Sequence, residues 1–388
     1  ELERWGLALR RREGGLPHTS AAPGHKTPRL TGCGDSTVRE VTRVLEEQAI
    51  KRGIQRNADS IPLSIVSDNS QVRGVVTLDL PTGRIDAIQT KAVILATEGH
   101  QGLWSKPSDG SGTGSALAIS AGIDLKGMEI TPRHPLTIRD CGIHIPLDVL
   151  GSGGRIRREN GDDVGPEEAL EGEPCVLDLR QMDADAKVWF SQTSMRIMDR
   201  LGIDISKDVI PLSPGVAYTT GGAPSDAQGR VVFQGHTTEG LPAEMWHTGL
   251  YAAGRSAHTG MHGSNALPGN LLLDDLVSGK AAGEHASEWA TEIKFGGNTQ
   301  IEEAVKGESD RISSIMVGDG MAVAKFHSKL TSAISSGSSN EASLAELRAI
   351  KDIGISLTDT SSVMNTEMAE ALRLVGLASV AEAILTSG

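Results

Sequence analysis

The 388-residue sequence is poor in several features that would assign it to a common class. Its three cysteines, Cys33, Cys141 and Cys175, are too few and too scattered for a disulfide framework, an iron–sulfur cluster or a zinc site. No apolar run approaches the roughly 18 residues needed to cross a bilayer, and the first residues lack the apolar core of a signal peptide. We therefore expect a chain of a reducing, cytoplasmic setting that binds no metal ion.

Clustered positive charge and hydrolase motifs are also scarce. The net charge is −13, and the basic residues are dispersed apart from residues 10–12 and 155–158, so a nucleic-acid partner is not expected. The nucleophile-elbow pattern G-x-S-x-G does not occur, which argues against a serine hydrolase. What the chain does have is 46 glycines and 38% hydrophobic residues. That composition fits an α/β protein of two or three domains with many loops.

Local patterns predict several elements in the first hundred residues. Thr37 and Glu40 have the spacing of a capping box, and apolar residues follow at helical intervals up to about Arg52, with Gly53 as the stop. Residues 74–80 and 84–97 read as strands around a turn at 81–83, and the second strand ends in a continuous apolar run. From about residue 291 onward, apolar residues at helical spacing predict packed helices.

The most informative stretch is residues 249–279. Leu250 to Ala253 form a short apolar run suited to a buried strand, and the loop that follows is rich in glycine. From about Asn270 the apolar spacing becomes helical. A helix N-terminus beside such a loop presents unpaired N–H groups and a partial positive charge to a ligand. On pattern alone, a plain tight connection and a cofactor cradle are equally good interpretations.

The letters LYAAG at 250–254, followed by spaced TG, HG, N and LL, resemble the C-terminal FAD-binding segment of the succinate dehydrogenase and fumarate reductase flavoprotein family, which includes L-aspartate oxidase. Further segments resemble family landmarks in the same order: WG at 5–6, AVILAT at 92–97, SGTG at 111–114, residues 129–135, GG at 153–154, VLDL at 176–179, IPLSPGVAYTTGG at 210–222 and MNT at 364–366. The resemblance therefore covers nearly the whole chain.

The resemblance implies a fold and a domain order. We expect an α/β protein with a partial, Rossmann-like FAD-binding domain at residues 1–127 and 247–290. An α+β capping domain would be inserted at 128–246, and a helical domain would occupy 291–388. The family's dinucleotide fingerprint G-x-G-x-x-G does not occur in the sequence. We therefore expect a fragment shortened at both ends, with a naturally short homologue as the alternative.

The resemblance also implies a cofactor, a substrate and partners. The cofactor would be FAD, contacted by Gly112, Thr113, Gly114, Gly254, Arg255, Gly269, Asn270, Leu271 and Leu272. The substrate would be a small carboxylate that exchanges hydride with flavin N5, and His134 would orient it as the catalytic residue. An iron–sulfur subunit is an implied partner, and contact with the inner face of a membrane would then be indirect, through partner subunits.

Several positions depart from the family pattern. A substrate-binding His of the family is Ala217 here, and a carboxylate-binding Arg is Ala266. The interval from Gly161 to Val176, where the family places its proton-shuttling Arg, contains no arginine. Arg133 and Arg139 are nearby cations that could compensate, whereas Arg155, Arg157 and Arg158 fit a solvated charged hairpin better. Two alternatives therefore stay open: a non-catalytic flavoprotein-like subunit, and an enzyme for a different substrate.

Overall fold

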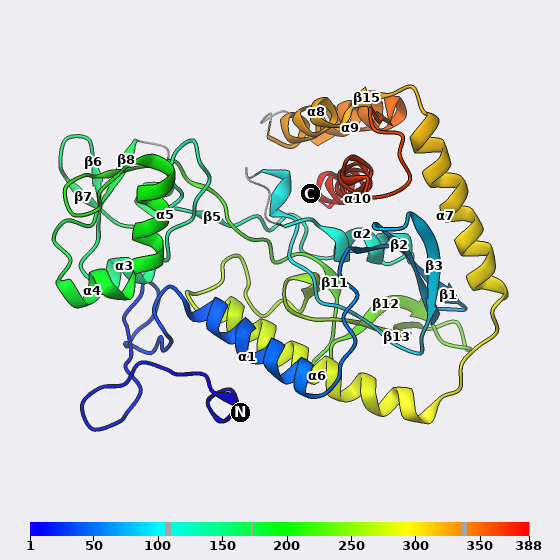
Figure 1. The fold of residues 1–388 in the computed structure, drawn as a ribbon, viewed down its shortest axis with the longest axis horizontal. Helices are drawn as coiled ribbons and strands as arrows, with labels where there is room; N and C mark the ends of the chain where they lie inside the picture. Colours follow the sequence, from blue (N-terminus) through cyan, green and yellow to red (C-terminus); the bar gives the residue numbers. More distant parts are fainter. Residues whose placement is uncertain (105–109, 172–173, 336–339, 388) are drawn as a thin grey trace. The chain divides into compact units, whose positions relative to one another are not determined.

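The computed structural model describes residues 1–104, 110–171, 174–335 and 340–387. The chain divides into two compact units, each assembled from separate stretches of sequence. Unit 1 consists of Glu1–Arg56, Arg133–Ala217 and Ala266–Leu272, and unit 2 of Asn57–Pro132, Tyr218–Asn265 and Leu273–Gly388. Both units combine helices with sheet (Figure 1), which confirms the predicted α/β class. Among the described residues, no helix is long and apolar enough to cross a membrane.

Unit 2 is built on a six-stranded sheet. The strands hydrogen-bond in the order β1-β2-β13-β12, with β3 added to β2 and β4 added to β13. Strands β1, β2 and β3 form an antiparallel meander, whereas β4 runs parallel to β13. The bounds are β1 (Ser60–Asp68), β2 (Gln71–Asp79), β3 (Arg84–Gln89), β4 (Val93–Leu95), β12 (Arg230–His236) and β13 (Pro242–Ala252).

The strand predictions are confirmed only in part. The segment at 74–80 lies almost wholly within β2, but the segment at 84–97 is two strands, because β3 pairs antiparallel with β2 while β4 pairs parallel with β13. Strand β1 was not predicted from the sequence. It joins β2 through Asn69 and Ser70, both with positive φ (50° and 57°), as a two-residue hairpin loop with primed-turn geometry requires.

Helices, two short strand pairs and two 3₁₀ turns complete the described part of unit 2. The core joins Leu95 and Leu250 of the sheet with Leu117 of α2, Leu330 of α8 and Leu374 of α10. The predicted helical region after residue 291 is confirmed. The further elements of this unit are η2 (Gln101–Leu103), α2 (Thr113–Ser120), β11 (Ala223–Pro224), η4 (Gly254–Ser256), β14 (Ala257–His258), α7 (Thr299–Val317), β15 (Met321–Ala322), α8 (Val323–Ser335), α9 (Asn340–Ile353), β16 (Ile355–Ser356), α10 (Thr366–Thr386) and most of α6 (Asn270–Glu292).

Unit 1 contains a four-stranded antiparallel sheet in the order β7-β6-β8-β9 and a separate two-stranded pair of β5 with β10. Its core is a distinct cluster that includes Ile156, Leu177, Phe190, Ile197 and Ile210. The bounds are η1 (Glu3–Trp5), α1 (Thr37–Lys51), β5 (Arg133–His134), α3 (Asp148–Gly151), β6 (Arg155–Arg158), β7 (Asp163–Val164), η3 (Glu168–Leu170), β8 (Cys175–Asp178), α4 (Ala184–Trp189), α5 (Ser191–Leu201), β9 (Ile210–Leu212) and β10 (Gly215–Val216).

Helix α1 confirms the predicted helix but not its predicted cap. The residue before the helix is Ser36, which makes no side-chain cap, and Thr37 instead accepts from Cys33 N (2.9 Å) and donates to Gly34 O (2.6 Å). Glu40 pairs with Arg43 at 2.9 Å instead of reaching back to the chain start. The capping-box prediction was therefore wrong, because both side chains bond to other groups within four residues along the chain. Gly53, with φ of 65°, does end the helix.

Candidate functional site

Two parallel strands of unit 2 end side by side. Strands β4 and β13 are in register from Val93 opposite Leu250 to Leu95 opposite Ala252, and Ala253 N donates to Leu95 O at 2.9 Å. In open α/β sheets, ligands bind beyond the carboxyl ends of such strands. The segments that follow, one starting at Ala96 and the other at Gly254, therefore form the first candidate for a cofactor site. The predicted buried strand at 250–253 is confirmed, with Leu250, Tyr251 and Ala252 fully buried.

Four residues contact one another just beyond these strand ends. We call them the strand-edge junction: Thr97, Gly114, Gly222 and Ser256. Ser256 Oγ accepts from Thr97 N (2.9 Å) and donates to Thr97 O (3.0 Å), while Thr97 Oγ1 accepts from Gly114 N at 3.0 Å. A Cβ on Gly114 would lie 2.6 Å from Thr97 Oγ1, and one on Gly222 would lie 2.5 Å from Ser256 O. Neither position has room for a side chain, so the start of α2 is fixed against both strands.

Gly112 and Thr113 lead into α2. Gly112 has φ of 66° and donates its N–H to Gly99 O at 3.1 Å, and a Cβ there would lie 2.8 Å from Leu377 Cδ2. Thr113 Oγ1 donates to Ser111 Oγ at 2.9 Å. Ser115, in the first turn of α2, is 1% exposed, and its hydroxyl has no partner within the part of the chain that the structure describes. An orphaned hydroxyl and a positively polarised helix start fit a polar, anionic cofactor.

Gly254 and Arg255 form the other side of this site. Gly254 has φ of 55°, donates its N–H to Ser278 Oγ at 2.8 Å, and would place a Cβ 2.3 Å from Asp275 Oδ1. Arg255 lies 3.7 Å from Asp275 on α6. Burial raises the pKa of Asp275, and the charge of Arg255 opposes that rise. Arg255 was predicted as an FAD contact, but its partner Asp275 was not predicted from the sequence.

The remaining four predicted FAD contacts belong to unit 1. Gly269 has φ of 81°, and a Cβ there would lie 2.5 Å from Leu30 Cδ2. Helix α6 begins at Asn270, as predicted, and Asn270 donates its N–H to Leu267 O at 3.0 Å. Leu271 and Leu272 are half-buried. The structure thus brings Gly112, Thr113, Gly114, Gly254 and Arg255 together in unit 2 and assigns the other four to unit 1.

His134 lies in β5 of unit 1, opposite Gly215 of β10. Its Nε2 donates to Ile145 O at 2.8 Å, so Nε2 carries the ring proton and Nδ1 is an acceptor. Burial lowers the pKa of His134 to about 4, partly offset by that bond, and His144 lowers it further. The ring is therefore neutral at pH 7. A neutral ring that has already committed its only N–H is poorly suited to binding a carboxylate.

Three arginines of unit 1 are engaged with acids. Arg155 and Arg157 lie 3.2 and 2.9 Å from Asp163, and Arg157 also lies 3.1 Å from Asp178. Arg180 binds Asp178 through two bonds of 2.9 and 2.8 Å. These five residues form what we call the hairpin network, and they support the interpretation of a charged hairpin. Residues 172 and 173 of the arginine-free interval lie outside the described residues.

Arg133 and Arg139, the two cations expected to compensate for the missing side chains, make contacts within unit 1. Arg133 donates to Pro214 O at 3.0 Å, which ties β5 to the segment before β10. The side chain of Arg139 is exposed, and its backbone N–H donates to Pro211 O at 3.0 Å. In unit 2, His262 bonds Asp274 on α6 at 3.0 Å.

Comparison with known proteins decides the family. The family model described as an FAD binding domain matches residues 1–272. The chain belongs to this family. The fumarate reductase flavoprotein subunit of Escherichia coli (strain K12) is 27% identical over 443 residues, covering 100% of this chain and 71% of the relative. The succinate dehydrogenase flavoprotein subunit of Rickettsia bellii is 26% identical, covering 97% and 71%.

The fold comparison agrees. A solved E. coli quinol fumarate reductase matches this flavoprotein with a TM-score of 0.88 at 24% identity, covering 99% of this chain and 73% of the other. The recognition of the succinate dehydrogenase and fumarate reductase family is confirmed, and so is FAD as the family's cofactor. Thr97 and Ser256 of the strand-edge junction were not among the predicted contact residues. The only available signal was that each follows a buried strand by two to four residues.

Proposed function

We propose that this flavoprotein is an FAD-dependent oxidoreductase that acts on a small carboxylate-like substrate. The observation that carries the proposal is the strand-edge junction, where the ends of β4 and β13 and the start of α2 are held by backbone bonds and close glycine contacts. Such preorganised backbone suits a ligand that needs geometry more than particular side chains. When bound, FAD would supply a centre that exchanges hydride with the substrate.

In unit 2, the predicted contacts around the junction would hold the cofactor: Gly112, Thr113 and Gly114 would offer the start of α2, and Gly254 and Arg255 the turn after β13. Gly269, Asn270, Leu271 and Leu272, in unit 1, stay predicted FAD contacts. Open loop geometry supports this assignment: Gly260 and Gly263 have positive φ, and a Cβ on either would meet nothing within 4 Å. The loop after β14 thus has free space beside its backbone.

His134 would orient the substrate, but its contacts limit how. With Nε2 donating to Ile145 O, the free Nδ1 can accept a hydrogen bond from a hydroxyl or a protonated carboxyl group. A charged carboxylate would need Nδ1 to be protonated, and the low pKa of the ring opposes this. The proposal therefore favours a substrate with a single carboxylate and a hydrogen-bond donor over a symmetric dicarboxylate.

A non-catalytic flavoprotein-like subunit is the second candidate. Ala217 and Ala266 stand where the resembling family has a histidine and an arginine, and Arg155 and Arg157 are held in the hairpin network. Each lost charged hydrogen bond would remove about 1.5–3 kcal/mol of substrate binding. This candidate keeps the fold and the partner while the reaction is lost.

Assembly and domain order are part of the proposal. The relatives are named flavoprotein subunits, and we propose that this chain also works beside an iron–sulfur subunit and reaches the inner face of a membrane only through partners. The assignment of residues 1–127 and 247–290 to the FAD domain, 128–246 to the cap and 291–388 to the helical domain stays a prediction.

Flavin spectroscopy on the full-length protein tests the proposal. The enzyme hypothesis predicts a bound flavin that is bleached anaerobically by at least one carboxylate from a panel that includes succinate and aspartate. His134→Gln should raise the KM for that carboxylate while leaving the flavin content unchanged. A flavin that dithionite bleaches but no carboxylate does would favour the non-catalytic subunit. Absence of bound flavin would contradict both.

A further inference from the structure

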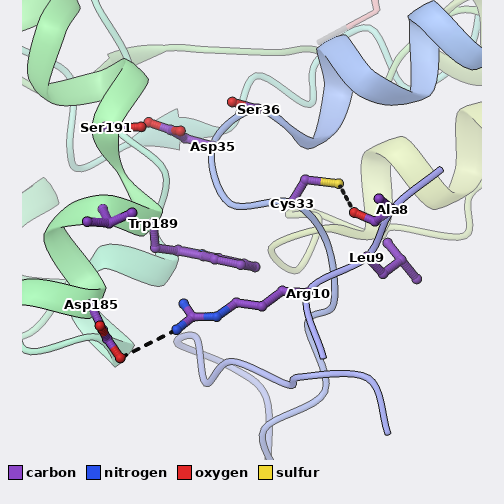
Figure 2. A pocket seen from close by; sticks show the side chains of 10 residues that line it. Ala8, Leu9, Arg10, Cys33, Asp35, Ser36, Asp185, Trp189 and Ser191 are labelled. Carbon is purple, nitrogen blue, oxygen red and sulfur yellow. Dashed lines mark hydrogen bonds and ion pairs between the residues drawn. The ribbon is translucent and has the colours of Figure 1, made fainter. Parts of the chain in front are cut away.

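A surface cavity in unit 1 has no role in the proposed reaction. It has a volume of about 430 Å³ and is bounded by three segments: residues 8–10, the turn at 33–36 before α1, and residues 185–191 of α4 and α5. Figure 2 shows the indole of Trp189 across its centre, with Arg10 and Asp185 on one side and Asp35 on the other. Cavities of roughly 300–1,000 Å³ are the usual size for small-molecule sites.

The three segments are fixed to one another. Asp35 Oδ2 accepts from Thr193 N at 2.6 Å and so caps α5, and Asp35 N donates to Trp189 O at 3.2 Å. A Cβ on Gly34 would lie 2.3 Å from Trp189 O, so the turn touches α4 directly. Cys33 Sγ donates to Ala8 O at 3.0 Å. The cavity is therefore preformed, which lowers the entropy that a ligand must lose.

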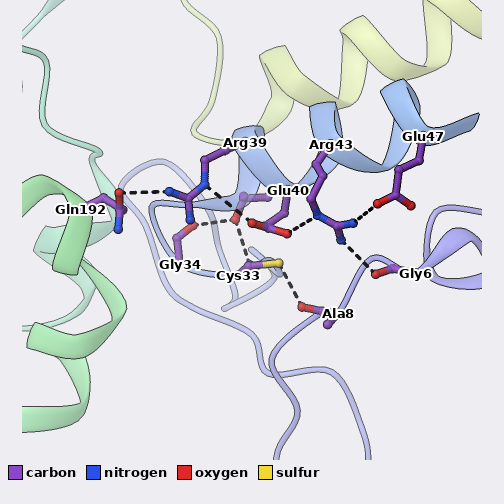
Figure 3. Close-up of polar contacts among 10 residues, drawn as sticks. Gly6, Ala8, Cys33, Gly34, Arg39, Glu40, Arg43, Glu47 and Gln192 are labelled. Atoms are coloured by element: carbon purple, nitrogen blue, oxygen red, sulfur yellow. Dashed lines mark hydrogen bonds and ion pairs between the residues drawn. The ribbon is translucent and has the colours of Figure 1, made fainter. Parts of the chain in front are cut away.

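Hydrogen bonds and ion pairs of residues outside the lining also connect the segments that bound the cavity. Arg39 on α1 donates to Gln192 on α5 at 3.3 Å, and Arg43 donates to Gly6 O at 3.5 Å while pairing with Glu40 and Glu47 (Figure 3). Helix α1 is thus tied to α5 and to the N-terminal segment through charged side chains that do not line the cavity.

The wall chemistry suits a cation. The guanidinium of Arg10 already stacks on Trp189, with Cζ 5.1 Å from the ring centroid, and lies 3.7 Å from Asp185. Arg10 thus shows what this surface binds: a flat cation on an indole face beside a carboxylate. The side chains of Arg10 and Asp185 are 37% and 86% exposed, so neither is locked in place.

The charges of the residues that line the cavity also favour a cationic ligand. The lining contains two carboxylates, Asp35 and Asp185, against the single guanidinium of Arg10. A third carboxylate, Asp148, lies close enough for the charge of Asp35 to add to the effect of burial, which raises the pKa of Asp148 to about 6. His18 contacts Trp189 as well, with ring centroids 5.7 Å apart, but burial and the charges of Arg10 and Arg12 lower its pKa and keep it neutral.

We propose that this cavity is a binding site for a small organic cation, a ligand with a guanidinium or primary ammonium group on a short apolar chain. The cationic head would take the place of Arg10 against Trp189 and Asp185, and the apolar stem would run along Val188 and Leu9. Arg10 is the internal competitor of the ligand. None of the lining residues is a predicted FAD contact, so we expect the ligand to bind in the apoprotein too.

Calorimetric titration of the full chain with agmatine tests this. Agmatine should bind saturably to the wild-type protein, and Asp185→Asn should weaken the binding about tenfold, the loss expected for one charged hydrogen bond. Asp199→Asn, an exposed aspartate on α5 outside the lining, is the matched control and should leave binding unchanged. Because Asp185 is so exposed, the thermal midpoint of its variant should equal that of the wild type.

Arg10→Ala gives the sharpest outcome. Removal of the competitor should tighten agmatine binding, whereas a weakened affinity would mean that Arg10 is itself a ligand-binding group. Absence of agmatine binding, equal binding by Asp185→Asn, or tighter binding of succinate than of agmatine would each overturn the proposal. Binding of an arginine-containing peptide but not of agmatine would also overturn it, in favour of a protein partner.

Discussion

The strand-edge junction of unit 2 and the hairpin network of unit 1 are held together by different kinds of contact. The junction is made of backbone bonds, two hydroxyls and glycines that leave no room for a side chain. The hairpin network is made of charged side chains that satisfy one another. Family letters persist at the junction, whereas the substrate side chains expected in unit 1 are replaced. A geometry set by backbone packing thus survives divergence that side-chain chemistry does not.

The largest effect should come from filling a glycine of the junction. Gly222→Ala would place a Cβ 2.5 Å from Ser256 O, a backbone atom that cannot move aside. We expect a loss of about 3 kcal/mol in the free energy of unfolding, and loss of flavin with it. Thermal unfolding and flavin absorbance measure both. Gly283→Ala, in α6 with open space around its Cβ, is the control and should be neutral or stabilising.

Breaking the hairpin network should cost less and leave the flavin in place. Asp178 is 2% exposed and bonds Arg180 and Arg157, which lower its pKa to about 2 against the cost of burial. Asp178→Asn should reduce stability by about 2 kcal/mol. Asp163→Asn, at a half-exposed position, should cost at most about 1 kcal/mol. Equal flavin loss in Asp178→Asn and Gly222→Ala would contradict the comparison.

The same carboxylate has a pH signature. Because the pKa of Asp178 is lower in the folded chain than its ordinary 3.8, its stabilisation is present above pH 4 and is lost as the pH falls toward 2. Urea unfolding between pH 5 and pH 2 should show a shallower decline in Asp178→Asn than in the wild type.

Restoring the family's histidine and arginine at positions 217 and 266 tests whether their replacement weakened substrate binding. The double variant Ala217→His and Ala266→Arg should strengthen dicarboxylate binding at least about a hundredfold, since each of the two charged hydrogen bonds contributes about 1.5–3 kcal/mol. Flavin content should stay the same, because neither residue belongs to the junction. Perturbation of the flavin spectrum by succinate measures the affinity. An unchanged affinity would show that more than these two side chains has been lost.

The smallest effect should come from two neutral histidines, one in each unit. Burial lowers the pKa of both His100 and His134 to about 4. The folded chain therefore binds fewer protons than the unfolded chain between pH 6.5 and 4, and stability should fall as the pH drops through that window. His100→Gln and His134→Gln should each remove part of this slope. His236→Gln, at an exposed position, should not.

Much of the chain was predictable because its signals are local. The apolar run at 250–253 and the apolar spacing after Asn270 became a buried strand and α6, since burial and helical period act over a few residues. The glycine landmarks carried the family and its cofactor. The capping box at Thr37 failed because other partners within four residues along the chain competed for both of its side chains.

The sequence by itself determined the class, the family and the order of most elements. Only the tertiary structure decided four contacts. Ser256 bonds Thr97, and Asp275 pairs with Arg255. Asp35 caps a helix 158 residues away, and the neutral ring of His134 donates its N–H to Ile145 O. Each of these depends on a contact between distant segments and on the burial that results. No local period or spacing encodes such a contact, because the two partners meet only after the chain has folded.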